Sequence, residues 1–174
     1  FLKESVANIK LSLKIVYTNY LKRVYERYGK SKSFFIRDTP VHLHEFYVPM
    51  GVKCNDIIIN SANIKAILDV NPFSIISGTG GAGKTIMLKH LFIDSLKNKK
   101  QIPIFTELRD LNNIDLPLID LLKLTTLNFG LEIEIAHFLK ALEKGHFILF
   151  LDGLDEVNKK RKVDLLREIN ELTI

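Results

Sequence analysis

The sequence has little cysteine and no long apolar run, and each shortage excludes a class of protein. Cys54 is the one cysteine among 174 residues, which excludes a disulfide scaffold and a cysteine-rich zinc module. No run of about 18 apolar residues exists, which excludes a membrane-spanning helix. Repeats and low-complexity tracts are missing too, while hydrophobic residues make up 47% of the chain, enough to offset the entropy of ordering it. We therefore expect a globular domain in a reducing, cytoplasmic setting.

The net charge is a weak guide to partners. Lys and Arg number 25 against 20 Asp and Glu, and much of the excess of +5 lies in short groups at 97–100 and 159–162. Such groups are typical of solvated helix ends, where cations complement the helix dipole. No ladder of aromatic residues is interleaved with them, so contact with nucleic acid is disfavoured.

The first segment has the pattern of an amphipathic helix. Its apolar residues follow one another at steps of three and four from Leu2 to Val24, and Gly29 ends the pattern. Such a helix either docks on its own domain or connects to a preceding one. We take residues 1–45 as an N-terminal amphipathic helix and linker. The stretch 31–60 is polar and irregular, and Ser61 is expected to cap a short helix after it.

From Phe73 onward, apolar strands alternate with helices. The expected strands cover 73–77, 102–106 and 146–151, and the expected helices cover 84–96, 117–127, 132–143 and 160–172. The last strand is apolar throughout, so we expect helices on both of its faces. This alternation predicts an α/β fold with a three-layer parallel sheet.

A phosphate-binding loop lies between the first expected strand and its helix. The residues are Gly78, Thr79, Gly80, Gly81, Ala82, Gly83, Lys84 and Thr85, which match G-x-x-x-x-G-K-S/T. Glycines let the backbone wrap around phosphate oxygens, and the helix adds its positive end. Lys84 would reach the β- and γ-phosphates, and the Thr85 hydroxyl would ligate Mg²⁺.

Acidic residues follow the strand 146–151. Asp152 would stand at the carboxyl edge of the sheet, where ligands bind in open α/β folds, and would hold Mg²⁺. Asp155 is the first choice for the residue that orients or deprotonates an attacking water, and Glu156 the second. Either acid could instead cap the following helix.

Together these motifs resemble a NACHT domain, a branch of the STAND class of P-loop NTPases. The loop reads GTGGAGKT, the acidic motif reads FILFLDGLDEV, the stretch 103–111 resembles the second-strand motif with its arginine, and the stretch 46–49 resembles the tyrosine–proline segment that precedes the loop. The resemblance covers residues 46–174, taken as the N-terminal part of such a domain. It implies a site for ATP or ADP with Mg²⁺, in which Pro49 approaches the base.

The resemblance implies a switch more than a metabolic enzyme. Members use the nucleotide to hold a closed or an assembled state, self-associate on activation, and carry sensor and effector domains, which here would lie outside residues 1–174. Relatives serve innate immunity in animals and defence against phage in bacteria. Because the expected strands do not include the one that normally lies between the loop strand and the acidic strand, we expect an incomplete sheet from the front half of a larger protein.

Three functions remain open. The first is a signalling NTPase with slow ATP hydrolysis, and the second is a non-hydrolysing module that binds nucleotide structurally. The third is a P-loop ATPase acting on nucleic acid, which only the basic balance suggests.

Overall fold

The chain folds as a mixed α/β structure with small sheets. The computed structural model describes the backbone of residues 2–31, 41–97 and 101–173 and the side chains of 15–30, 41–97 and 101–173. Helices and strands follow one another along the chain in the order α1 Leu2–Tyr28, β1 Lys30–Ser31, β2 Val41–His42, α2 Leu43–Phe46, β3 Val52–Cys54, β4 Ile57–Ile59, α3 Ile64–Val70, α4 Lys84–Lys97, β5 Ile102–Glu107, α5 Leu118–Asn128, α6 Ile135–Glu143, β6 Phe147–Asp152 and α7 Lys159–Glu171. Two short 3₁₀ turns, η1 Leu108–Asn112 and η2 Leu154–Glu156, follow β5 and β6.

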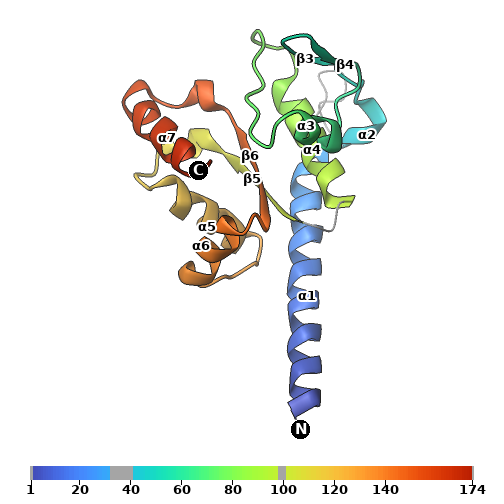
Figure 1. Ribbon diagram of the computed structural model, residues 1–174, viewed down its shortest axis with the longest axis vertical. Coiled ribbons are helices and arrows are strands. Elements are labelled where there is room, and N and C mark those ends of the chain that lie inside the picture. Colours follow the sequence, from blue (N-terminus) through green and yellow to red (C-terminus); the bar gives the residue numbers. More distant parts are fainter. Residues whose placement is uncertain (1, 32–40, 98–100, 174) are drawn as a thin grey trace.

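Strands β5 and β6 pair in parallel and lie between the helices (Figure 1). The register sets Ile102 opposite Phe147 and Glu107 opposite Asp152. Helices cover both faces of this pair, as the apolar strand pattern predicts: α1 and α4 lie on one side and α5, α6 and α7 on the other (Figure 1).

Alternating residues of each strand feed two hydrophobic clusters. Phe105 and Phe150 pack with Phe92 of α4, whose ring meets both edge-on with centroids 5.5 Å away. Ile104 and Phe147 point to the other face, into a cluster with the helices α5 to α7. The period-two alternation of a strand therefore divides the core into two layers of side chains.

The prediction of a third strand over 73–77 is wrong, and the parallel sheet has two strands within the described residues. The segment 73–77 runs without a strand partner, and Phe73 and Ile75 are 54% and 87% exposed. An isolated segment has no neighbouring ladder to take up its N–H and C=O groups, so its apolar, β-branched sequence alone does not make it a strand.

Helix α1 closes the free edge of β5. The Ile102 N–H donates to His146 O. The backbone N–H and C=O groups of the even-numbered residues of β5 therefore point toward β6, and those of the odd-numbered residues point away from it. On that outer edge the Tyr20 hydroxyl donates to Pro103 O at 2.7 Å and the Tyr28 hydroxyl to Phe105 O at 3.4 Å. Proline is tolerated here because its missing N–H would face no strand. Burial raises the pKa of Tyr28 to about 12, so the hydroxyl keeps its proton.

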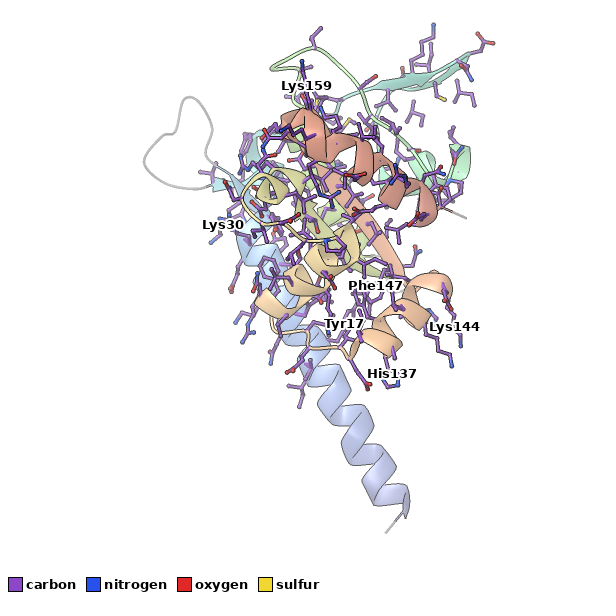
Figure 2. The ribbon with its side chains drawn as sticks, turned by 90° about the vertical axis from the view of Figure 1, so that its left-hand side faces the viewer. Tyr17, Lys30, His137, Lys144, Phe147 and Lys159 are labelled. Carbon is purple, nitrogen blue, oxygen red and sulfur yellow. The ribbon has the colours of Figure 1, made fainter. Side chains whose placement is uncertain are left out.

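The predicted N-terminal helix is confirmed, and its second half docks on the domain. Tyr20, Val24 and Tyr28 are buried in the first hydrophobic cluster. Tyr17 lies near the level where α1 meets the packed body, and the helix extends beyond it (Figure 2).

The stretch before the loop contains more structure than the sequence indicated. Strands β3 and β4 form an antiparallel hairpin, turned by Asn55 with a φ of 52°. Strands β1 and β2 form another pair, and residues 32–40 between them lie outside the described residues. The cap of α3 is Asn63 rather than Ser61, since the Asn63 side chain accepts a hydrogen bond from the Ala66 N–H at 2.9 Å.

The remaining elements agree with the predictions except at their ends. Helix α6 begins at Ile135, three residues later than the predicted Glu132, and Gly145 follows its end with a φ of 65°. Over the described parts of the chain, no helix has the length and apolar character needed to cross a membrane.

Candidate functional site

The glycine-rich segment forms a tight loop that leads into α4. Gly81 and Gly83 have φ values of 76° and 84°, a region that side-chain-bearing residues rarely occupy. The Ala82 N–H donates to Thr79 O at 3.2 Å, and the first turn of α4 starts with the Met87 N–H on Gly83 O at 2.9 Å. The tight turn of the loop therefore depends on the left-handed backbone conformation of Gly81 and Gly83.

Lys84 lies over this loop. Its ammonium group donates to Gly78 O at 3.0 Å and to Thr79 O at 3.2 Å. These two carbonyls hold the positive charge at the loop. An anion with several oxygens could draw the same ammonium away from them, because it adds the attraction between opposite charges to the hydrogen bonds.

Thr85, the next residue of α4, connects the loop to the sheet. Its hydroxyl donates to Asp152 Oδ1 at 3.1 Å, and Asp152 is the last residue of β6. Burial raises the pKa of Asp152, and the hydrogen bond from Thr85 and the charge of Lys89 partly oppose that rise. The structure thus brings together the two residues predicted to ligate a metal.

A small cavity opens beside this hydrogen bond, and its walls include residues that the motif analysis missed. It is lined by Thr85, Lys89, Glu107, Arg109, Asp152, Gly153 and Glu156. Arg109, on η1, forms an ion pair with Glu107, and its Nη1 lies 3.9 Å from Glu156 Oε2. Glu107 could have been found from the sequence, because it ends one strand as Asp152 ends the next, and parallel strands bring such ends to one edge.

The remaining predicted residues differ in how close they lie to this cavity. Glu156 lines it, whereas Asp155 is exposed and is not among the lining residues. Pro49 is exposed as well. Its neighbour Met50 does reach the loop, because a Cβ placed on Gly83 would stand 3.2 Å from the Met50 sulfur.

The aromatic residue of the same segment stacks on the loop helix. The rings of Tyr47 and His90 lie 4.0 Å apart and 13° from parallel. Partial burial lowers the pKa of His90. The segment 47–50 therefore packs along α4 next to the glycine-rich loop, although Pro49 itself points to solvent.

The donor set fits a magnesium ion that is shared with phosphate groups. Mg²⁺ takes oxygen ligands and usually keeps several waters, with one or two carboxylates and substrate phosphates completing its shell. The hydroxyl of Thr85 and the carboxylate of Asp152 are such ligands, and they face each other at 3.1 Å. Within the described residues, no three His, Cys, Asp or Glu side chains are grouped to hold a metal by themselves.

Comparison of the chain with protein-family models, curated proteins and solved structures finds no significant match. The functional assignment therefore depends on the geometry of the site and on the motifs.

Proposed function

We propose that the chain is a nucleotide-binding signalling module that takes ATP or ADP with Mg²⁺ and hydrolyses ATP slowly in the full-length protein. The observation that carries this proposal is the hydrogen bond between Thr85 and Asp152, because it joins the glycine-rich loop to the acidic end of a parallel strand. A loop that binds phosphate and an acid that binds metal must meet at one place for a metal–nucleotide complex to be held.

Each part of the site would act on a different group of the nucleotide. The loop N–H groups and the start of α4 would cradle the phosphates, and Lys84 would leave its two carbonyl partners for the β- and γ-oxygens. Thr85 and Asp152 would hold the metal. Glu156, which also lines the cavity, would orient or deprotonate the attacking water.

The wider role follows from the resemblance to NACHT domains. We propose a three-layer P-loop NTPase fold in the whole protein, cytoplasmic location, and self-association that the bound nucleotide controls, in immune or antiphage defence. The motifs over 46–174 support this proposal through their order and spacing.

A non-hydrolysing nucleotide module is the second candidate, and one observation favours it. The guanidinium of Arg109 stands between Glu107 and Glu156, so positive charge is already close to the carboxylate that would accept a proton. This contact engages Glu156 Oε2, one of the two oxygens that could accept that proton. In this alternative the nucleotide would stabilise one conformation without being consumed.

Binding is tested by titrating the full-length protein with a fluorescent ADP in the presence of Mg²⁺. Lys84→Ala should weaken binding at least about tenfold, since it removes the charge at the loop. Lys97→Ala is the matched control, because Lys97 lies on the same helix with its side chain 80% exposed. Equal affinity for wild type and Lys84→Ala would contradict the proposed phosphate site.

Hydrolysis is tested separately by single-turnover measurements with ATP on the same proteins. Release of phosphate by the wild type, absent from Lys84→Ala, supports the signalling NTPase. Binding of ATP without any phosphate release would favour the non-hydrolysing module instead.

A further inference from the structure

The turn after β6, which carries both candidate acids, is tied to the turn after β5 by one side chain. The Asn112 Nδ2 group donates to the backbone O of Glu156 at 2.9 Å, and Asn112 Oδ1 accepts from the backbone N–H of Asn158 at 2.8 Å. The two bonded residues flank Val157, so a single amide spans the end of η2. The orientation of the amide follows from its partners. A flipped amide would set Asn112 Oδ1 against the Glu156 carbonyl oxygen and Asn112 Nδ2 against the Asn158 N–H.

The same turn is held at two other points. The Glu156 N–H donates to Gly153 O at 3.0 Å inside the turn, and Gly153 has a φ of 77°. Val157 is 3% exposed and belongs to the hydrophobic cluster beneath α7. The side chain of Val157 therefore packs the turn against the hydrophobic core, whereas the hydrogen bonds of Asn112 connect it to η1.

The turn η1 also reaches the acid itself. Arg109, three residues before Asn112, has its Nη1 atom 3.9 Å from the Glu156 carboxylate. The turn η1 thus contacts both the backbone and the side chain of Glu156, although more than 40 residues of sequence lie between them. Neither residue would need to touch a nucleotide to act in this way.

We propose that Asn112 is a positioning residue, which sets where Glu156 stands relative to Asp152 by clamping η2 to η1. This inference rests on the proposed ATP hydrolysis and adds to it a residue outside both motifs. A hydrolytic reaction depends steeply on the placement of its general base, so a loosened turn should lower the rate of the chemical step while nucleotide binding persists.

The test compares steady-state ATP hydrolysis and ADP affinity for Asn112→Ala, Asn112→Asp and Asn113→Ala in the full-length protein. Asn112→Ala should lower kcat about tenfold or more, with KM and ADP affinity within about twofold of wild type. Asn112→Asp should also lower kcat, because it sets a carboxylate oxygen against the Glu156 carbonyl oxygen, although the other oxygen can still accept from the Asn158 N–H. Asn113→Ala is the control, because the Asn113 side chain is exposed and makes no hydrogen bond among the described residues.

A second readout follows the clamp directly. Hydrogen exchange of the Asn158 amide should be faster in Asn112→Ala than in wild type or Asn113→Ala. Unchanged kcat in Asn112→Ala, or a fall in kcat matched by the loss of ADP affinity, would overturn the inference while the proposed function stands. If the wild type releases no more phosphate than Lys84→Ala, the proposed hydrolysis fails, and the inferred role of Asn112 is overturned with it.

Discussion

The hydroxyl of Thr85 donates a hydrogen bond to Asp152 Oδ1 at 3.1 Å across 67 residues of sequence. Thr85 lies in the first turn of α4, and Asp152 is the last residue of β6. The contact therefore fixes the beginning of a helix against the end of a strand at the edge of the sheet. A cation placed between them would find two oxygen ligands already converging.

Removal of either partner should weaken metal-dependent nucleotide binding. Thr85→Ala and Asp152→Asn each take away an oxygen ligand or its charge, so we expect ADP affinity with Mg²⁺ to fall at least about tenfold. Affinity measured in EDTA should change much less. Thr18→Ala, which removes an exposed threonine hydroxyl from α1, outside the site, serves as the control. Equal losses with and without Mg²⁺ would contradict the assignment of the two residues to the metal.

Two glycines of the loop should respond differently to alanine. Gly83 has a φ of 84° and the Met50 sulfur only 3.2 Å from its would-be Cβ, so Gly83→Ala should cost about 1–2 kcal/mol and disrupt binding. Gly80 has an ordinary φ and no atom within 4 Å of such a Cβ, so Gly80→Ala should be tolerated. Urea unfolding and ADP titration check both. Similar behaviour of the two variants would show that the loop shape differs from the one described here.

The two candidate acids should contribute unequally to turnover. Glu156 lines the cavity and Asp155 does not, so Glu156→Gln should lower the single-turnover rate by about 100-fold, and Asp155→Asn by much less. Both variants should bind ADP as the wild type does. The opposite ranking would restore Asp155, the first choice from the sequence, as the residue that activates water.

The cover of the β5 edge can be tested through stability. Tyr20→Phe leaves the buried carbonyl of Pro103 without its partner at 2.7 Å, so the free energy of unfolding should fall by about 1–3 kcal/mol. Tyr28→Phe removes a longer bond of 3.4 Å and should cost less than about 1 kcal/mol. Chemical denaturation of both variants gives the comparison. A larger loss for Tyr28→Phe would contradict the assignment of the edge contact to Tyr20.

An ion pair within α7, whose carboxylate also binds the start of α5, should make stability depend on pH. Arg161 lies 2.7 Å from Glu168 Oε1, and Glu168 also accepts from the Leu118 N–H. Burial alone would raise the pKa of Glu168, but these hydrogen bonds outweigh it and lower the pKa. The stabilisation is thus complete above the ordinary glutamate value of 4.5 and is lost as the pH falls through the lowered pKa.

Glu168→Gln tests this linkage. The variant should unfold more easily than wild type at neutral pH, by about 1–3 kcal/mol, and the difference should shrink in acid. Urea unfolding at a series of pH values measures it. A difference that stays constant down to strongly acidic pH would exclude the ion pair as its source.

Local patterns predicted the helices better than the strands. The spacing of apolar residues in α1 and the punctuation by Pro117 and Gly145 mark helix limits, because these signals act within one or two turns. Strand signals are less reliable, because a strand also needs a partner. The segment 73–77 has an apolar, β-branched sequence but no strand partner, and it is not a strand. The β3–β4 hairpin was missed, because its only signals are the turn-favouring Asn55–Asp56 pair and the β-branched run after it, while β3 itself has one β-branched residue.

Chemistry in the sequence determined which groups this protein can offer to a ligand: a glycine-rich loop with Lys84 and Thr85, and acids after an apolar strand. Tertiary structure decided which of them meet. The register of β5 and β6 brought Glu107 beside Asp152, and the turn η2 set Glu156, but not Asp155, among the residues that line the cavity. Such pairings depend on sheet register and turn geometry, which arise from contacts between distant residues and leave no local pattern.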